Sequence, residues 1–267
     1  MNESELLFTD ILGCDRASLY LNKGRLLRVQ ERMRIASALK RRMRGEPIQY
    51  ILKKCEFMGL EFKLTPSVLI PRPETEILVE KAHALALSLK PHVPCPHILD
   101  MGTGSGCIAV TLATLLPGAV IDAVDISNEA LRVARENAAA HNARINFIQG
   151  DLFCQALIPA RYDLIVSNPP YVAGQVIAQL QPELRHEPRV ALDGGKDGLD
   201  FYRRLVRFAP EYLRKAGILL MEMGFGQRQA IEEMIGKAGT LAIMDIVKDY
   251  SGIERVVMAQ RKMPSGA

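Results

Sequence analysis

Hydrophobic positions in the first part of the chain recur every three or four residues, which is the period of an amphipathic helix. They form two groups, Leu6, Leu7, Ile11 and Leu12, then Leu26, Leu27, Met33, Ile35 and Leu39. Gly13 and Asn22-Lys23-Gly24 interrupt the pattern between helices. We therefore predict a helical region over residues 3–45.

A short hairpin and an extended connector are expected next. Cys55–Phe57 and Leu60–Leu64 are brief apolar stretches joined at Met58-Gly59, a pattern typical of two antiparallel strands. The prolines of Thr65–Pro73 disfavour helical geometry in the residues that precede them. Pro73-Glu74-Thr75-Glu76 then opens a helix, because proline suits the first turn and carboxylates favour the positive end of the helix dipole. The predicted divisions are a helical domain (1–54), a hairpin and linker (55–72) and a larger domain (73–267).

From residue 97 onward, apolar stretches of strand length alternate with helical patterns. This alternation predicts an α/β fold, a Rossmann-like and mostly parallel seven-stranded sheet with helices on both faces. The last two strands have no helix between them, so we expect an antiparallel edge. The expected strands are His97–Met101, Val120–Val124, Ile145–Ile148, Tyr162–Ser167, Gly217–Met223, Leu241–Val247 and Arg255–Ala259. The expected helices are Cys107–Leu116, Asn128–His141, Gly198–Leu213 and Gln227–Lys237.

Composition excludes several classes of protein. With 48% hydrophobic and 24% charged residues among 267, the chain is not dominated by disorder. The longest near-apolar run, Cys107–Leu116, is about half of a membrane-spanning helix, and the acidic N-terminus does not resemble a secretory signal. Five scattered cysteines without a C-x-x-C pair favour a reducing cytoplasm. The five histidines have no metal-ligand spacing, so we expect no metal site.

Positive charge is concentrated near the N-terminus. Residues 1–50 contain ten basic and six acidic side chains, which accounts for the whole net charge of +4. The excess is greatest in Lys23–Arg44, where nine basic residues accompany Glu31 alone. Two interpretations stay open: a solvated face of a helical hairpin, or a docking surface for an acidic partner or RNA phosphates. No aromatic residue lies between Tyr20 and Tyr50, which disfavours base stacking there.

A glycine-rich turn follows the first strand of the larger domain. The strand ends at Asp100-Met101, and Gly102-Thr103-Gly104-Ser105-Gly106 leads into a helix. Glycine lets the backbone approach a ligand closely and adopt positive φ. The spacing G-x-G-x-G differs from the G-x-G-x-x-G of nicotinamide and flavin binders, so no pyrophosphate is required here. The turn suits the amino-acid part of S-adenosylmethionine; the simpler alternative is an ordinary strand-to-helix turn.

Two later strand ends carry further candidates for a nucleoside site. Asp125 ends the second strand, where a carboxylate can accept hydrogen bonds from both ribose hydroxyls. The simpler alternative is an N-cap or first-turn carboxylate for the next helix, and nicotinamide binders share such an acid. Gly150-Asp151-Leu152-Phe153 follows the third strand. This position commonly meets an adenine ring through an acid, here Asp151, or a backbone amide, and through an apolar wall that would contain Leu152.

The most specific pattern is Asn168-Pro169-Pro170-Tyr171, directly after a buried strand. Two prolines fix the backbone and remove two N–H donors, so the Pro169 carbonyl is left as an acceptor beside the Asn168 side-chain oxygen. Two acceptors at fixed spacing can hold both hydrogens of a planar NH₂ group, and Tyr171 can stack on its plane. An amide or aromatic amine nitrogen is a poor nucleophile because its lone pair is delocalised. Acceptors that orient the lone pair toward a methyl donor address that difficulty.

Together, the two turns resemble the signature of class I methyltransferases that act on exocyclic or amide nitrogens. Further segments narrow the resemblance to the bacterial release-factor glutamine N5-methyltransferases, the PrmC/HemK family, from about residue 5 to about residue 260. These segments are Gly45–Tyr50, Phe57–Leu60, Leu69–Glu76, Glu187-Pro188 with Ala191-Leu192, and Gly194–Leu199.

The resemblance implies transfer of a methyl group from S-adenosyl-L-methionine to the glutamine side-chain amide in the Gly-Gly-Gln motif of peptide chain release factors. It implies a class I methyltransferase fold whose helical domain docks the substrate, and a cytoplasmic monomer without membrane contact or direct nucleic-acid readout. The residues it implies for substrate and catalysis are Asn168, Pro169, Pro170 and Tyr171. Those it implies for the cofactor are Gly102, Thr103, Gly104, Ser105, Gly106, Asp125, Asp151, Leu152 and Asn168.

Two other functions are compatible with parts of the sequence. An adenine-amino DNA or RNA methyltransferase would use the same Asn-Pro-Pro-Tyr turn, because adenine also presents an NH₂ group. Residues 51–267 are neutral, however, and an enzyme that flips bases should line its approach with Lys or Arg. A non-catalytic binding protein is disfavoured because both motifs are intact.

Overall fold

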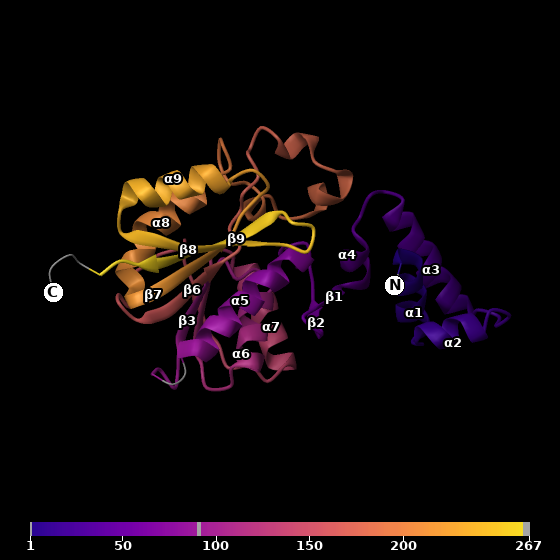
Figure 1. The fold of residues 1–267 in the computed structure, drawn as a ribbon. Coiled ribbons are helices and arrows are strands. Elements are labelled where there is room, and N and C mark those ends of the chain that lie inside the picture. Colours follow the sequence, from indigo (N-terminus) through magenta and orange to yellow (C-terminus); the bar gives the residue numbers. More distant parts are fainter. Residues whose placement is uncertain (1, 90–91, 264–267) are drawn as a thin grey trace.

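The computed structural model describes residues 2–89 and 92–263, and within them the predicted strands form one seven-stranded sheet (Figure 1). The strands are β3 (His97–Met101), β4 (Val120–Asp125), β5 (Asn146–Gln149), β6 (Tyr162–Ser167), β7 (Leu213–Glu222), β8 (Leu241–Lys248) and β9 (Glu254–Arg261). Their order is β5-β4-β3-β6-β7-β9-β8. The pairs from β5 to β7 are parallel, and β9 is antiparallel to both β7 and β8. The predicted antiparallel edge is confirmed.

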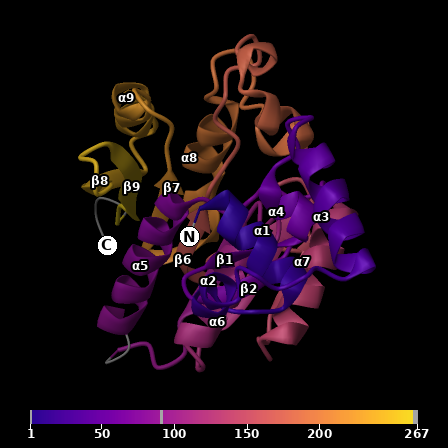
Figure 2. The same cartoon turned by 90° about the vertical axis from the view of Figure 1, so that its right-hand side faces the viewer.

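Helices cover both faces of this sheet (Figures 1 and 2). They are α5 (Pro73–Leu89), α6 (Cys107–Leu115), α7 (Asn128–Ala140), α8 (Asp200–Tyr212) and α9 (Arg228–Ala238). Successive strand residues point to opposite faces, so Ile218 and Leu220 join the core under α5 and α6, while Leu219 and Met221 join the core under α8 and α9. The near-continuous apolar strands of the sequence are therefore buried on both sides.

The N-terminal helices form a smaller unit to one side of the sheet, linked to it through a hairpin (Figure 1). Its elements are α1 (Glu3–Leu12), α2 (Arg16–Leu21), α3 (Val29–Arg42), α4 (Ile48–Leu52), β1 (Lys54–Phe57) and β2 (Leu60–Lys63). Leu7, Ile11 and Ile35 belong to a core of their own. Phe57 and Phe62 of the hairpin instead join the core of the large sheet. The predicted helices and hairpin are confirmed.

Two segments differ from the sequence expectation. Strand β7 begins at Leu213, directly after α8, and not at Gly217. Leu213 pairs with Tyr162, and pairing then resumes between Leu164 and Ile218, so the intervening residues bulge. A bulge has no hydrophobic period, which is why the pattern missed this part of the strand. The long loop after β6 also contains three short 3₁₀ helices, Ile177–Gln179, Pro182–His186 and Arg189–Ala191.

The candidate site residues lie at one edge of the sheet because the strands that carry them pair in parallel. Met101, the last residue of β3, pairs with Val124 on one side and with Ser167 on the other. The glycine turn, Asp125 and Asn168 therefore leave neighbouring strands side by side. This is the carboxyl edge, beside the strand at which the chain order reverses, where open α/β sheets bind ligands. Among the described residues, no helix is both long and apolar enough to cross a membrane.

Candidate active site

The glycine turn forms the floor of an inner cavity at the carboxyl edge of the sheet. Gly102 and Gly104 line this cavity with φ of +78° and +54°, and nothing lies within 4 Å of a Cβ built on either. The backbone is thus open to a ligand where the sequence predicted a close approach. The cavity is further lined by Ser67, Val68, Leu69, Met101, Val124, Asp125, Ile126, Ser127, Ala130, Gly150, Asp151, Leu152, Pro170, Pro188, Val190, Ala191 and Phe201.

The other residues of the turn lie behind the cavity and shape it from there. The Thr103 hydroxyl donates to Asp100 Oδ2 at 2.6 Å, and the Ser105 carbonyl accepts from Asn137 Nδ2 at 2.8 Å. Asp100 is fully buried, which raises its pKa to about 7. Its Oδ1 has no hydrogen-bond partner within the described part of the chain. Gly106 serves packing: a Cβ there would lie 3.0 Å from Ala134 Cβ on α7.

Gly106→Ala is expected to lower the free energy of unfolding by about 2–4 kcal/mol. A φ of +83° strains any non-glycine residue, and the added methyl would also press on α7. Gly102→Ala is the matched control, because it carries similar φ strain but meets open space. Urea denaturation of both variants measures the difference; equal losses would show that helix packing does not require Gly106.

Asp125 joins the glycine turn to the next helix. Its Oδ2 accepts from the Gly104 amide at 2.8 Å, and its Oδ1 accepts from the Ser127 amide at 2.9 Å. Burial raises its pKa, while these backbone donors oppose that shift. The carboxylate lines the inner cavity, as a ribose acceptor would. It is not the N-cap of α7, because that position is Ser127, whose side chain accepts from the Ala130 amide at 3.1 Å.

The segment after β5 contributes one buried and one exposed side chain. Leu152 lines the inner cavity and is buried, with φ of +53°. Asp151 lines the same cavity but forms an ion pair with Arg204 at 2.9 Å, with more than half of its side chain exposed. Phe153 turns away from the cavity and stacks on Tyr212 with ring centroids 5.0 Å apart. The apolar wall here is therefore formed by Leu152 and not by Phe153.

The Asn-Pro-Pro-Tyr turn separates the inner cavity from a second, outer cavity of about 390 Å³. Pro170 lines the inner cavity, whereas Asn168, Pro169 and Tyr171 line the outer one. The outer cavity is also lined by Glu3, Arg42, Pro47, Ile48, Gln49, Leu69, Ile70, Arg72, Val172, Gln181, Glu183, Leu184, Glu187, Ala191 and Leu192. Leu69 and Ala191 belong to both linings, so the two cavities meet at this turn.

The Asn168 amide is held from behind by two buried side chains. Its Nδ2 donates to Thr75 Oγ1 at 3.0 Å, and Thr75 Oγ1 donates to Glu222 Oε2 at 2.7 Å. Burial raises the pKa of Glu222 to about 7, against the bond from Thr75. Burial and the nearby Glu222 charge raise the pKa of Tyr171 to about 12, so its phenol stays neutral at physiological pH.

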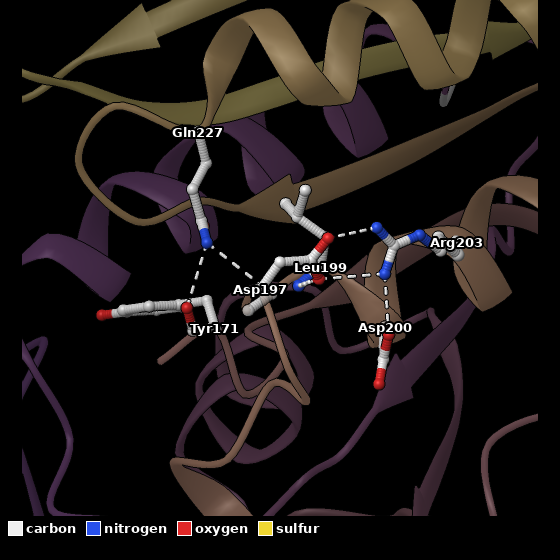
Figure 3. Close-up of polar contacts among 7 residues, drawn as sticks. Tyr171, Asp197, Leu199, Asp200, Arg203 and Gln227 are labelled. Atoms are coloured by element: carbon white, nitrogen blue, oxygen red, sulfur yellow. Dashed lines mark hydrogen bonds and ion pairs between the residues drawn. The ribbon is translucent and has the colours of Figure 1, made fainter. Parts of the chain in front are cut away.

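Gln227 ties the Asn-Pro-Pro-Tyr turn to two other loops (Figure 3). Its Nε2 donates to the carbonyls of Tyr171 at 3.0 Å and Gly198 at 3.2 Å, and its Oε1 accepts from the Gly224 amide at 2.9 Å. Gly198 has φ of +79°, and a Cβ there would lie 2.5 Å from the Tyr171 carbonyl oxygen. The backbone at Gly198 is thus packed directly against the Asn-Pro-Pro-Tyr turn, and this packing restricts movement of the turn.

The loop that carries Gly198 is closed by an exposed ion-pair cluster, also drawn in Figure 3. Arg203 contacts Asp197 and, at 2.7 Å, Asp200. The bond from Arg203 lowers the pKa of Asp197 to about 2. About half of each side chain is exposed, so the cluster adds little to stability. Its effect is to hold the shape of the loop behind Tyr171.

The outer cavity is bounded by the N-terminal helices and by the 3₁₀ segment of the long loop. Arg42 of α3 forms ion pairs with Glu3 at 2.8 Å and with Glu183 at 3.1 Å. A Cβ on Gly45 would lie 3.3 Å from Pro182 Cβ. Arg72 of the linker contacts the buried carboxylate of Glu187. The N-terminal helices, the linker and the long loop, which are far apart in sequence, therefore form one wall of the outer cavity together.

Sequence reasoning missed several of the residues that surround the site. The sequence pattern places Thr75 in a helix start and in one segment of the family resemblance, Glu222 close to the end of a strand, and Gln227 at a helix start, and it assigns none of them to the site. Their signal in the sequence is the presence of polar side chains in otherwise apolar or capping positions. Within residues 2–89 and 92–263, no group of three or more His, Cys, Asp or Glu side chains is placed to hold a metal ion.

Comparison with known proteins identifies close sequence relatives. Residues 1–52 match the family described as PrmC N-terminal domain, and residues 79–195 match the Methyltransferase small domain. The chain is 46% identical over 256 residues to a release factor glutamine methyltransferase of Geobacter sulfurreducens, covering 96% of this chain and 87% of that protein. It is 40% identical over 259 residues to the protein of that name from Chlorobaculum tepidum, covering 94% and 87%.

Solved structures share the fold at lower sequence identity. A methyltransferase from Pyrococcus furiosus superposes with a TM-score of 0.57 at 18% identity, covering 85% of this chain and all of that one. The catalytic domain of hMettl16, solved in complex with MAT2A 3'UTR hairpin 1, superposes with a TM-score of 0.61 at 19% identity, covering 88% and 81%. At such identities the likeness concerns the fold alone, and it confirms the predicted methyltransferase architecture.

Proposed function

The chain belongs to the family of release factor glutamine methyltransferases, and from this we propose the substrate, the methyl donor and the roles of its residues. It transfers a methyl group from S-adenosyl-L-methionine to the side-chain amide nitrogen of the glutamine in the Gly-Gly-Gln motif of peptide chain release factors. The observation that carries the assignment is the Asn-Pro-Pro-Tyr turn between two adjoining cavities. The relatives support this function and not the adenine-amino alternative.

The inner cavity fits the cofactor. The open backbone of Gly102 and Gly104 can accommodate its amino-acid part, and the Asp125 carboxylate faces the cavity as a ribose acceptor. Leu152 supplies an apolar surface for a ring, with Asp151 at its edge. When bound, the cofactor supplies an electrophilic methyl group on a cationic sulfur.

The outer cavity receives the glutamine side chain. Asn168 Oδ1 and the Pro169 carbonyl accept the two hydrogens of the amide NH₂, and Tyr171 packs on its plane. The two acceptors turn the nitrogen lone pair toward the inner cavity and favour the pyramidal nitrogen of the transition state. Pro170 keeps the acceptors at fixed spacing. No general base is needed before transfer, because the surplus proton can leave to water once the nitrogen carries the methyl group.

The helical domain 1–54 docks the release factor. It provides one wall of the outer cavity, and its Lys23–Arg44 segment carries the excess positive charge. Three of these cations form ion pairs within the chain: Arg25 contacts Glu31, Arg41 contacts Glu46, and Arg42 contacts Glu3 and Glu183. Arg28, Arg32 and Arg44 form no ion pair within the described residues. These three are therefore better candidates for contact with an acidic partner than Arg25, Arg41 and Arg42 are. The enzyme works as a monomer and reads no nucleic acid directly.

Reversing charge at Arg28, Arg32 and Arg44 together (R28E/R32E/R44E) is expected to raise KM for release factor several-fold and to leave cofactor Kd unchanged. Electrostatic docking acts on encounter with the protein substrate, and the effect should weaken as salt is added. Lys237→Glu on α9 is the control for an exposed charge reversal elsewhere. A KM equal to that of the wild type would identify the segment as a solvated face.

The function itself is tested by mass spectrometry of a release factor after incubation with the protein and S-adenosylmethionine. We expect the mass of one methyl group on the peptide that contains the Gly-Gly-Gln motif. A release factor with the motif glutamine replaced by alanine should gain nothing. Methylation of an adenine-containing oligonucleotide in a parallel incubation, with none on the release factor, would support the alternative instead.

A further inference from the structure

The orientation of the Asn168 amide decides whether the outer cavity contains two acceptors or one. An asparagine side chain has a donor NH₂ and an acceptor oxygen of nearly equal shape, so a half-turn exchanges them. Only with Oδ1 toward the cavity can Asn168 and Pro169 both accept from a substrate NH₂. In the reverse orientation, two NH₂ groups would face each other. Asn168 Oδ1 accepts no hydrogen bond from any described residue, so it is available to a substrate.

Thr75 and Glu222 determine which orientation is present. Above the raised pKa of Glu222, which is about 7, its carboxylate is ionised and only accepts hydrogen bonds, and its Oε2 lies 2.7 Å from Thr75 Oγ1. The single hydroxyl hydrogen of Thr75 is therefore directed at Glu222. Thr75 Oγ1 can then only accept toward Asn168, at 3.0 Å, and this requires the Nδ2 side of the amide. The chain of bonds thus turns Asn168 Oδ1 away from Thr75.

We propose that Glu222, acting through Thr75, is a positioning residue that holds the Asn168 amide with its oxygen toward the substrate. The inference rests on the proposed function and adds to it a reason for the buried Thr75–Glu222 pair. Neither residue lines the outer cavity, so neither contacts the substrate. They act on the reaction through Asn168.

The pair is held rigidly. Thr75 and Glu222 are 2% and 1% exposed, so water does not compete for their hydrogen bonds. Thr75 lies in the first turn of α5, and its amide donates to the Arg72 carbonyl at 3.0 Å. Glu222 ends β7, where its backbone pairs with Val256 and its carbonyl accepts from Tyr202 at 2.9 Å. Two elements of the core therefore fix the distance between the side chains.

The buried carboxylate of Glu222 lowers the stability of the fold, so a role in function would explain its presence better than a role in packing. A buried carboxylate loses hydration, and neighbouring Glu74 adds repulsion, while Arg255 and Arg72 act in the opposite direction. The first turn of α5, with its positive dipole end, supplies further compensation. A methionine would fill the same space without this desolvation. Stability and activity should therefore respond in opposite directions when Glu222 is replaced.

The first test removes the Thr75 hydroxyl. Thr75→Val should lower kcat for release factor methylation about tenfold, because the amide loses the partner that orients it. Cofactor Kd and KM for release factor should stay within about twofold. Thr75→Ser keeps the hydroxyl and should restore kcat, although it loses a packed methyl. Thr111→Val is the matched control, since the buried Thr111 hydroxyl has no partner in the described chain.

The second test removes the acceptor. Glu222→Met should lower kcat about tenfold while the melting temperature stays level or rises. The double variant Thr75→Val/Glu222→Met should lose no more activity than either single variant, because both break the same chain of bonds. Three results would overturn the proposal. The first is a double variant whose kcat loss is the product of the two single losses. The others are a Thr75→Ser variant as impaired as Thr75→Val, and a wild-type kcat in Thr75→Val or Glu222→Met. Absence of methylation by the wild-type protein would instead refute the proposed function.

Discussion

Asn168→Ala is expected to lower kcat for release factor methylation by about 10²–10³-fold, as removal of one positioned polar group in an active site typically does. The substrate amide would keep the Pro169 carbonyl but lose the acceptor that orients its second hydrogen. The interaction strengthens as the nitrogen becomes pyramidal, so the loss should fall on kcat more than on KM. Single-turnover kinetics with labelled cofactor measure it directly.

Asn168→Asp is the sharper companion variant. Aspartate keeps the shape and an acceptor, so partial activity is expected where the alanine variant has almost none. It has no NH₂ to donate to Thr75, and it places a second carboxylate near Glu222, so activity should remain below that of the wild type. Cofactor binding and a cooperative melting transition should persist in both variants. Near-wild-type kcat for folded Asn168→Ala would assign the chemistry to another loop.

Asp125→Ala is expected to weaken cofactor binding by roughly 10- to 150-fold, corresponding to about 1.5–3 kcal/mol for a hydrogen bond to a charged group. The variant removes the ribose acceptor and also the bonds that hold the Gly104 and Ser127 amides. Isothermal titration calorimetry with S-adenosylmethionine measures the change. Asp125→Asn keeps one acceptor oxygen and should lie between the wild type and the alanine variant.

Asp245→Ala is the control for that measurement, because Asp245 is exposed on the outer strand β8 and lies outside the cavity linings. Its cofactor affinity should equal that of the wild type. If Asp125→Ala also binds cofactor with unchanged affinity, the carboxylate acts only on the backbone, by accepting from the Gly104 and Ser127 amides. The ribose would then be held by other residues of the inner cavity.

The parts of the fold with a strong local period could be read from the sequence. Strands β3 and β6 have the predicted bounds, and the antiparallel edge follows from the absence of a helix between β8 and β9. The first residues of β7, from Leu213 to the residue before Gly217, could not be predicted from the sequence. Leu213 pairs with Tyr162, and the register then shifts before Leu164 pairs with Ile218. Pairing across a bulge depends on which strand lies opposite, and a single sequence does not specify that.

The sequence by itself determined the chemistry of this protein. Residue types and their positions at strand ends are enough to predict a methyl transfer to nitrogen. The residues concerned are Asn168-Pro169-Pro170-Tyr171, the glycine turn and Asp125. Parallel strands then bring these ends together, as the order of elements already implied.

Only the tertiary structure decided how the chemistry is supported. Thr75, Asn168 and Glu222 are separated by long stretches of chain, and no local pattern links them. The ion pairs of Arg42 with Glu3 and Glu183 likewise join an N-terminal helix to a loop of the large domain. Hydrogen bonds and ion pairs act over a few ångströms in space whatever the sequence separation. The hydrogen bonding of the Asn168 amide is therefore a property of the packed fold, because it depends on side chains that meet only when α5 lies against β7.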